Sequence, residues 1–590
     1  MVWEDGGGNS ASYPIRTKGG HGGPPLQMIL RFLTLLVIAV ACVGVRAQKT
    51  TDDTGTISGR VVNESGQPLA GAALFVRSMN SLSTTRNTTT DADGNFRLNG
   101  LEPALYTINA IAPAYATDNT APPTYYRIGD TVNLELVRGG VVTGTVTNSA
   151  GDPVIGVRVR AIRVRDAKGQ TPRVPSFGYQ EQTTDDRGVY RIYGLLPGSY
   201  LVSAGGGAGG FSPVFNPYDT DVPTYAPSST RDDAAEITVR SGEDSTADIR
   251  YRGERGYSIG GTVRLAATSG ATVTLRARGS QIPLAATFQM PSTHGFAFGG
   301  LPDGEYILRA QENFPGLTAN TEQLASSATK RITIKGANVT GVELIPTPLA
   351  SIKGRIVLEP SKAPECEGKR APLLAEILVQ LQRPEKDTED EDGIYVGPLG
   401  GFATPESTGT LVWRNVRPGK YRFEPRFYAH YWYLHSITMN TMGIKPQKID
   451  AAANWTVTKS GDQLNNVTIT LALGAASVHG HLALADGAVV QSGTNLYLVP
   501  AEPDKVTDVL RYFVTDVASD GTFALNNLAP GKYLVLTQTN VDPSLAGQAK
   551  LREPETEAAT ARAKLRRTAE TKKTEIELKP CQNLTGYQLK

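Results

Sequence analysis

Hydrophobic and polar residues alternate along much of the chain from about residue 54 onward. In residues 157–161, Val, Val and Ala are separated by two arginines, and residues 236–239 show the same alternation. A period of two places successive side chains on opposite faces of an extended strand. The pattern therefore predicts half-buried antiparallel strands, each with one face toward a core and the other in water.

Two short signatures recur in the same order five times, which indicates internal repeats. The first signature is a predicted strand with a central glycine. Its copies are residues 57–61, 142–146, 259–263, 352–356 and 478–482, centred on Gly59, Gly144, Gly261, Gly354 and Gly480. The second signature begins with Gly or Asn and ends in Tyr. Its copies are residues 100–106, 194–200, 300–306, 415–421 and 527–533.

Tight turns precede three of the tyrosine signatures, at residues 91–96, 185–190 and 519–523, and each contains a glycine that can adopt a positive φ. Many short strands in units of this size predict an all-β fold, a tandem array of five small Greek-key β-sandwiches. The predicted units are residues 54–138, 139–253, 254–347, 348–473 and 474–590. An Ala-, Glu-, Lys- and Arg-rich insertion at 549–573 predicts one exposed helix in the last unit.

Composition and charge agree with a β-rich protein and argue against nucleic-acid binding. The 590 residues include 62 Gly and 37 Pro, above the average usage of about 7% and about 5%. The formal net charge is only +2, from 59 basic and 57 acidic residues. Such a balance creates no overall field that would attract a polyanion.

The first 47 residues read as a leader with a secretory signal peptide. A basic start at Arg31 is followed by an apolar run at 32–45 and a small-residue cleavage pattern ending at Ala47. The run is too short for a transmembrane helix. We expect translation to start at Met28 and the mature chain to be secreted, without an integral membrane segment, to the periplasm or cell surface. Lipidation at Cys42 is the alternative.

The repeats resemble the carboxypeptidase regulatory-like domain. The resemblance rests on the glycine strand, the Gly-x-Pro hairpins at 66–71 and 151–156, the Thr-Asp-x-x-Gly turn and the Leu-x-Pro-Gly-x-Tyr signature. It implies a transthyretin-like sandwich, related to collagen-adhesin B-type repeats and within a carbohydrate-binding-like fold group. The layout is similar to that of bacterial secreted proteins built from tandem copies.

The sequence carries no recognisable catalytic, metal or cofactor motif. None of the six histidines has Glu three residues further on, as a zinc carboxypeptidase would need. The Gly-rich run at 205–210 is followed by Phe-Ser-Pro, which favours a loop over a nucleotide site. His479 and His481 are interpreted as solvent-facing, and the acidic run at 387–393 as a loop tip. We expect a protein that is not an enzyme.

The five signature tyrosines and two cysteines are interpreted as structural. Each tyrosine begins an alternating strand, so its ring can close one end of the core while its hydroxyl bonds to backbone. These residues are Tyr106, Tyr200, Tyr306, Tyr421 and Tyr533. Cys366 and Cys581 form an even pair in an oxidising compartment, so a disulfide between them is one expectation, and two free thiols are the other.

Residues 427–433 form the densest aromatic segment, and we expect the ligand site there. In a strand, Tyr428, His430 and Trp432 would share one face, where exposed rings suit the apolar faces of sugars. The alternative is a strand covered on both sides. The resulting hypothesis is a secreted, non-enzymatic binding and spacer protein of the bacterial envelope that binds polysaccharide. A protein-interaction module, accessory to an outer-membrane or cell-wall assembly, is the alternative.

Overall fold

The computed structural model describes most of the chain after the leader. The described residues are 54–79, 85–117, 124–171, 180–206, 216–265, 270–279, 283–289, 295–312, 323–384, 401–440, 447–483, 489–539 and 547–589. The predicted leader, Cys42, the acidic run at 387–393 and most of the Gly-rich run lie outside them. Among the described residues, no helix is long and apolar enough to cross a membrane.

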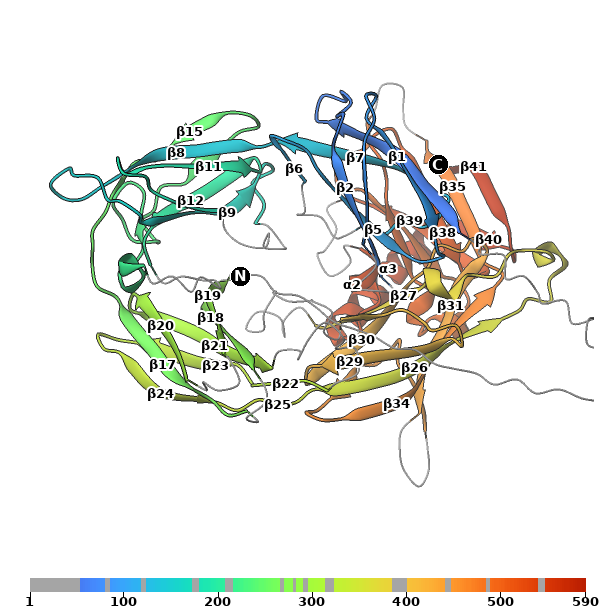
Figure 1. Cartoon of the computed structure of the whole chain (residues 1–590). Helices are drawn as coiled ribbons and strands as arrows, with labels where there is room; N and C mark the ends of the chain where they lie inside the picture. The colour runs from blue at the N-terminus through green and yellow to red at the C-terminus, as the bar shows by residue number, and fades with distance from the viewer. Residues whose placement is uncertain are drawn as a thin grey trace, which may run out of the picture. The chain divides into compact units, whose positions relative to one another are not determined.

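The strands form paired sheets that enclose five separate cores, as the sequence predicts (Figure 1). In the first sandwich, one sheet is β4 (Asn95–Leu101), β1 (Gly55–Asn63), β7 (Thr131–Arg138) and β6 (Tyr115–Thr117), and the other is β3 (Thr85–Thr89), β2 (Ala73–Ser78) and β5 (Tyr106–Ile111). In the second, one sheet is β11 (Val189–Leu195), β8 (Gly140–Thr147), β15 (Asp244–Thr246) and β16 (Ile249–Arg250), and the other is β10 (Gln180–Thr183), β9 (Arg158–Asp166), β12 (Gly198–Ala204), β13 (Thr224–Tyr225) and β14 (Ile237–Val239).

The third and fourth sandwiches repeat this arrangement with additional short strands. In the third, one sheet is β20 (Gly295–Leu301), β17 (Tyr257–Val263) and β24 (Val339–Leu344), and the other is β19 (Pro283–Gln289), β18 (Ala271–Ala277), β21 (Gly304–Glu312), β22 (Ala325–Ser326), β23 (Lys330–Ile334) and β25 (Thr347–Pro348). In the fourth, one sheet is β29 (Thr410–Val416), β26 (Ala350–Glu359), β34 (Gln463–Leu473), β31 (Trp432–Asn440) and β32 (Lys448–Asp450), and the other is β28 (Phe402–Ala403), β27 (Leu378–Gln382), β30 (Gly419–Arg426) and β33 (Thr456–Thr458).

The fifth sandwich adds two helices to the same plan. Its sheets are β38 (Thr522–Leu528), β35 (Ala476–Leu482) and β41 (Asn583–Leu589), and β37 (Phe513–Asp516), β36 (Asn495–Pro500), β39 (Gly531–Gln538) and β40 (Glu575–Leu578). The helices are α2 (Gln548–Leu551) and α3 (Thr556–Lys572). Short 3₁₀ turns are η1 (Pro217–Thr220), η2 (Pro364–Cys366), η3 (Leu374–Glu376), η5 (Pro503–Lys505) and η6 (Val509–Arg511).

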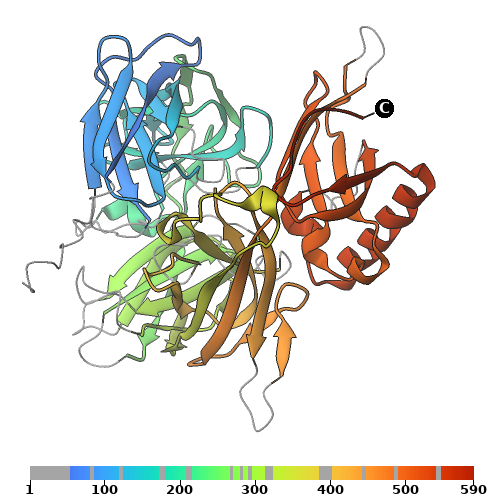
Figure 2. The ribbon, with the colours of Figure 1, turned by 90° about the vertical axis from the view of Figure 1, so that its right-hand side faces the viewer.

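The predicted helix is present, but only one of its faces is exposed. Ala561, Leu565 and Ala569 of α3 pack with Tyr497 and Leu536 of the sheet beneath, in a small core outside the sandwich interior. Figure 2 shows both helices, in red, beside this sheet. The helix is rich in charged residues, so its narrow buried stripe of mainly alanine residues was not distinguished from exposed surface in the sequence.

The first strand of every sandwich pairs in parallel with the closing strand, which corrects the expectation of wholly antiparallel pairing. The pairs are β1 with β7, β8 with β15 and β16, β17 with β24, β26 with β34, and β35 with β41. Alternation identifies the buried face of a strand but not its direction. Parallel neighbours need a long connection, and the rest of each sandwich provides it.

The signature glycines lie where the two parallel strands approach most closely. A Cβ at Gly354 would lie 2.8 Å from the carbonyl oxygen of Val467 in the closing strand. At the other four positions a Cβ would overlap the corresponding carbonyl even more. Those pairs are Gly59 with Val132, Gly144 with Ala247, Gly261 with Val342, and Gly480 with Tyr587. Only a residue without a Cβ fits between the strands.

Each signature tyrosine is buried, and its hydroxyl donates a hydrogen bond to the carbonyl oxygen four residues earlier. The O···O distances are 2.7 Å to Glu102 for Tyr106, 2.8 Å to Leu196 for Tyr200, 2.7 Å to Pro302 for Tyr306, 2.9 Å to Arg417 for Tyr421, and 2.7 Å to Ala529 for Tyr533. Burial raises the pKa of Tyr306 and Tyr533 to about 12, so both hydroxyls stay protonated donors.

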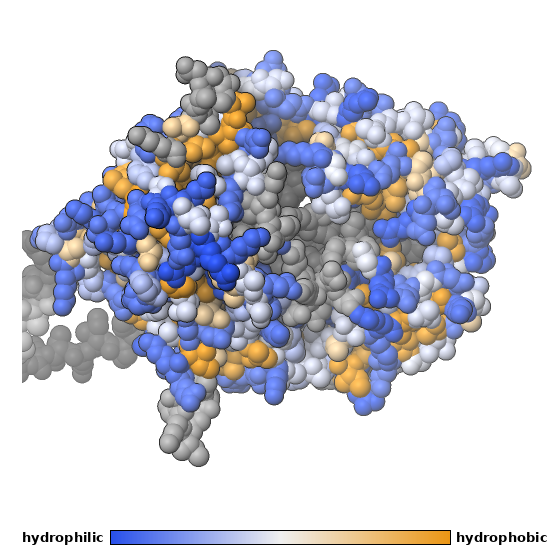
Figure 3. All heavy atoms as spheres, turned by 180° about the vertical axis from the view of Figure 1, so that it is seen from behind, coloured by the Kyte–Doolittle hydropathy of each residue, from blue (hydrophilic) through white to orange (hydrophobic). Residues whose placement is uncertain are grey.

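Large hydrophobic side chains that remain exposed are distributed over several sandwiches. They include Phe75, Ile155, Ile345, Val457 and Val489. On the face shown in Figure 3, hydrophobic residues lie in small groups separated by polar ones. Isolated apolar residues of this kind are ordinary for a protein surface.

The close approach at Gly261 predicts a sharp difference between two neighbouring glycines. Gly261→Ala forces β17 and β24 apart, so we expect the third sandwich to lose about 3 kcal/mol or more of unfolding free energy. Gly260→Ala is the matched control, because its Cβ would lie 3.6 Å from the nearest atom, the carbonyl oxygen of Phe296. Calorimetry of residues 48–590 measures both. Equal transitions for the two variants would contradict the packing explanation.

The tyrosine bond predicts a graded loss in the fourth sandwich. Tyr421→Phe keeps the ring and removes only the bond to Arg417, so it should cost about 1 kcal/mol. Tyr421→Ala also removes a buried aromatic ring and should cost about 3 to 5 kcal/mol. Hydrogen exchange of peptides from β26 and β34 reports these losses, with the exposed Tyr193→Phe as control. Unchanged exchange in Tyr421→Ala would show that the ring supports no core.

Candidate functional site

The residues predicted to bind a ligand do not share one exposed face. Strand β31 begins only at Trp432, because Tyr431 before it has a left-handed backbone with φ of 66°. Tyr428 and His430 are exposed, whereas the Trp432 side chain is only 4% exposed. The expected set of Tyr428, His430 and Trp432 is therefore wrong as a single binding face, and the alternation assumed for this segment does not apply to residues 427–431.

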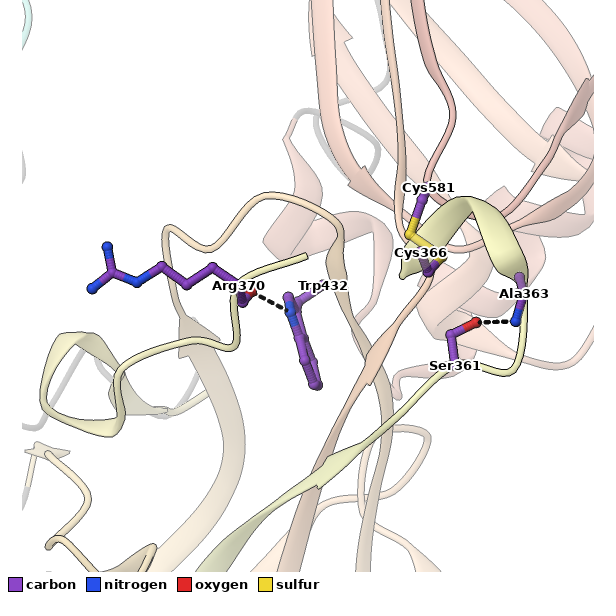
Figure 4. The surroundings of a disulfide bond; sticks show 6 residues. All are labelled: Ser361, Ala363, Cys366, Arg370, Trp432 and Cys581. Carbon is purple, nitrogen blue, oxygen red and sulfur yellow. Dashed lines mark hydrogen bonds between the residues drawn. A yellow bond between two sulfur atoms is a disulfide. The ribbon is translucent and has the colours of Figure 1, made fainter. Parts of the chain in front are cut away.

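Trp432 is covered by the insertion that follows β26. Its Nε1–H donates to the carbonyl oxygen of Arg370 at 3.0 Å, within the segment between η2 and η3 (Figure 4). That bond satisfies the one polar group of the indole, so the side chain is stable in a buried position. The covering segment is about 60 residues away in sequence, which is why the local pattern could not reveal the burial.

A disulfide connects the same insertion to the fifth sandwich. Cys366 at the end of η2 and Cys581, just before β41, are both buried, with a Cα–Cα distance of 5.4 Å (Figure 4). The bond spans 215 residues of sequence. It joins the long insertion of the fourth sandwich to the segment that leads into the closing strand of the fifth, which is the first of the two alternatives left open by the sequence.

Asn527 adds a polar contact at this junction, and the sequence interpretation missed it. It occupies the first position of the tyrosine signature with φ of 56°, a conformation that Asn tolerates better than most residues. Its Nδ2 donates to the carbonyl oxygens of Ala429 at 2.8 Å and Trp432 at 2.7 Å. The bound segment is the aromatic segment itself, which therefore serves as an interdomain contact.

The fourth signature uses its asparagine in the same way. Asn415 also has a positive φ, of 57°, and its Oδ1 accepts a hydrogen bond from the backbone N–H of Leu324 at 2.8 Å. Leu324 directly precedes β22 of the third sandwich. The first three signatures have glycine at this position. The change from Gly to Asn was the sequence signal for these side-chain contacts.

The fourth and fifth sandwiches also exchange core residues. Val509 and Leu510 of η6 pack into the core of the fourth sandwich. In return, Tyr433 and Ala472 of the fourth pack into the core of the fifth. Burial raises the pKa of Tyr433. Because each core includes side chains from its neighbour, separating the two sandwiches would expose apolar surface on both.

The α2–α3 insertion makes a second contact with the fourth sandwich. The Nη1 of the buried Arg422 on β30 donates to the carbonyl oxygen of Ala549 at 2.6 Å. The Nε1–H of Trp455 donates to Oε1 of Glu555 at 3.1 Å. Burial lowers the pKa of Arg552, whose guanidinium lies 5.3 Å from the ring centre of Phe513. The insertion thus contacts the fourth sandwich at a second place, through residues other than those of the disulfide.

Arg127 of the first sandwich contacts the exposed end of the aromatic segment. Its Nη1 donates to the carbonyl oxygen of Tyr428 at 3.2 Å and lies 3.9 Å from Oε2 of Glu376, and its guanidinium lies 5.8 Å from the Tyr428 ring centre. The pKa of Glu376 is raised overall by burial, although the positive charge of Arg127 opposes this shift. The exposed ring of Tyr428 is therefore already part of an interdomain contact.

The histidines that the structure describes do not come together as a metal site. No group of three His, Cys, Asp or Glu side chains with metal-binding geometry occurs among the residues that the structure describes. Nε2 of His479 lies 3.0 Å from Oδ1 of Asn526, on an exposed part of the fifth sandwich.

Comparison with known proteins identifies the first sandwich. Residues 56–136 match the family model of the carboxypeptidase regulatory-like domain, which confirms the resemblance found in the sequence for this segment. No curated protein matches the chain.

Among solved structures, the Bacillus anthracis TIE protein is 18% identical and the match covers 50% of this chain and 51% of that one, with a TM-score of 0.14. The minor pilin GBS52 of Streptococcus agalactiae is 13% identical, with 34% of this chain and 96% of that one covered and a TM-score of 0.19. A streptococcal ancillary pilin is 15% identical, with 50% and 99% covered and a TM-score of 0.14.

The structure of the junction predicts that removing its disulfide destabilises the two sandwiches, and that also removing its Asn527 hydrogen bonds separates them. Cys366→Ser with Cys581→Ser should lower the unfolding free energy of the fourth and fifth sandwiches by about 2 to 4 kcal/mol. Adding Asn527→Ala removes the two bonds to the aromatic segment and should increase the radius of gyration in solution scattering as the sandwiches separate. Asn454→Ala, which loses only a bond to Asp450 within its own sandwich, is the control. An unchanged radius in the triple variant would show that the junction is not held by these contacts.

Proposed function

We propose that the protein is a secreted, non-enzymatic binding and spacer protein of a bacterial envelope, located in the periplasm or at the cell surface. The observation that carries the spacer role is the junction of the fourth and fifth sandwiches, which combines a disulfide, two Asn527 bonds and exchanged core residues. Sandwiches joined only by flexible linkers would need none of these contacts. They suit a protein in which the fourth and fifth sandwiches must keep a fixed arrangement, as a spacer requires.

Three further parts of the proposal rest on the sequence. The non-enzymatic role rests on the missing catalytic motifs, and secretion rests on the leader at residues 1–47. We propose the unit boundaries 54–138, 139–253, 254–347, 348–473 and 474–590 for the five sandwiches.

Polysaccharide is the proposed ligand class, and an envelope protein is the alternative. The polysaccharide assignment rests on the family resemblance. The aromatic segment at 427–433 does not support this assignment, because Trp432 is buried and Tyr428 is in contact with Arg127. The alternative draws on the sheet edges, such as β3 and β19, to which a partner strand can pair.

Pull-down of the mature chain, residues 48–590, tests the binding role. We expect the protein to be retained by insoluble cell-wall polysaccharides and not by bare matrix. The same chain, immobilised, is exposed to solubilised envelope proteins in parallel. Retention by polysaccharide alone supports the first ligand class, and selective capture of one envelope protein supports the second. Retention in neither arm would contradict a binding role and leave only the spacer role.

A further inference from the structure

A polar hollow lies on the outer face of the first sandwich. It has a volume of about 680 Å³, within the usual range for ligand sites. It extends across β1, β4 and β7, which are neighbours in one sheet. Side chains in its lining include two guanidinium groups, two carboxamides and two hydroxyls. These belong to Arg60, Arg97, Asn95, Asn133, Ser58 and Thr131.

The two arginines of this polar hollow are held in place without being neutralised. Nε of Arg60 donates to the carbonyl oxygen of Asp93, and Nε of Arg97 donates to Oδ1 of Asn99, both at 2.9 Å. Within the described part of the chain, neither guanidinium has a carboxylate within ion-pair distance. The outer Nη groups therefore keep donors for an anionic oxygen, in the paired geometry that suits a carboxylate.

The one carboxylate in the lining does not compete for these donors. Oδ1 of Asp91 accepts the backbone N–H groups of Asp93 at 3.0 Å and Asn95 at 2.8 Å, so it closes its own turn. The lining therefore carries two positive charges against one carboxylate that is already hydrogen-bonded.

The other sandwiches lack this pair of arginines. In the second sandwich, Thr145 takes the place of Arg60, and Arg191, in the place of Arg97, is paired with Asp244 at 2.6 Å. The corresponding positions are Thr262 and Ala297 in the third sandwich, Arg355 and Val412 in the fourth, and His481 and Ala524 in the fifth. Unneutralised arginines at both positions are thus a feature of the first repeat and not of the fold.

The position of the hollow argues for a saccharide over a peptide strand. A peptide that extends a sheet needs a free edge, and of the three strands under the hollow only β4, at one border, is an edge strand. Strand β1 is hydrogen-bonded to β4 on one side and to β7 on the other, so the face across β1 and β7 offers no free backbone. A ligand on this face must bind through side chains. Hydroxyl and carboxamide groups both donate and accept, so they suit neighbouring sugar hydroxyls, and the two guanidinium groups suit a carboxylate.

We infer that the hollow of the first sandwich binds an acidic polysaccharide, with Arg60 and Arg97 contacting a uronate carboxylate and Asn95, Asn133, Ser58 and Thr131 contacting sugar hydroxyls. This inference rests on the proposed polysaccharide-binding function and gives it a site and a ligand charge. It does not depend on the spacer role.

Titration of residues 48–590 with polygalacturonate tests the site. We expect binding that weakens with added NaCl, because the contacts are between exposed charges. Arg60→Gln and Arg97→Gln should each weaken it about tenfold, as for a lost charge-assisted bond. Arg191→Gln is the matched control, since its guanidinium is already paired, and it should leave the affinity within about twofold of wild type. Thermal unfolding checks that each variant is folded.

Two ligand controls distinguish the outcomes. Methyl-esterified polygalacturonate keeps the sugars and loses the charge, and poly-L-glutamate keeps the carboxylates on a peptide. Both should bind at least tenfold more weakly than polygalacturonate. Equal affinity for poly-L-glutamate overturns the saccharide assignment. If the wild type binds neutral polysaccharides as well as the acidic one, or if Arg60→Gln with Arg97→Gln binds unchanged, this site is wrong while the proposed function stands. Absence of binding to every polysaccharide overturns this site and the polysaccharide assignment of the proposed function.

Discussion

The structure depends on one close approach, between the first strand of each sandwich and its closing strand. In the third sandwich, a Cβ on Gly261 would lie only 1.8 Å from the carbonyl oxygen of Val342, and the other four sandwiches pair a glycine with a carbonyl in the same way. The contact brings together the two ends of each repeat and places the first strand between two hydrogen-bonded neighbours. The tyrosine signature, which buries a ring and bonds its hydroxyl four residues back, then closes the core of the same repeat.

Variation between the repeats occurs around this constant frame. The first position of the tyrosine signature requires a positive φ, which Gly or Asn can adopt. Where it is Asn, as at Asn415 and Asn527, the side chain reaches the preceding sandwich and converts a turn into an interdomain contact. On the outer face of the sheet, the residues at the positions of Arg60 and Arg97 vary between repeats without disturbing the core, and no other repeat has arginine at both. Packing and surface chemistry are therefore separable in this chain.

Local patterns in the sequence predicted the sandwiches and their cores, but not the direction of the closing strands and not the site. The structural roles of Gly59 and Tyr106 can be predicted from the sequence, because each depends on contacts within one repeat. Trp432 does not, because the segment that covers it lies about 60 residues earlier and the strand starts one residue after the left-handed Tyr431. The direction of the closing strand was equally invisible, since alternation is the same for parallel and antiparallel neighbours. Long-range contacts decided the burial of Trp432 and the direction of the closing strands, which the sequence interpretation missed.

The parallel pairing of first and closing strands has a consequence for how the chain folds. No sandwich can complete the sheet of its first strand until its own closing strand has been made, so the repeats can fold one after another from the N-terminal end. Cys581 lies just before β41, the closing strand of the fifth sandwich. The insertion that carries Cys366 therefore keeps an unpaired thiol until the partner cysteine, 215 residues later, has been made. The disulfide can form only after the fourth sandwich and most of the fifth are present.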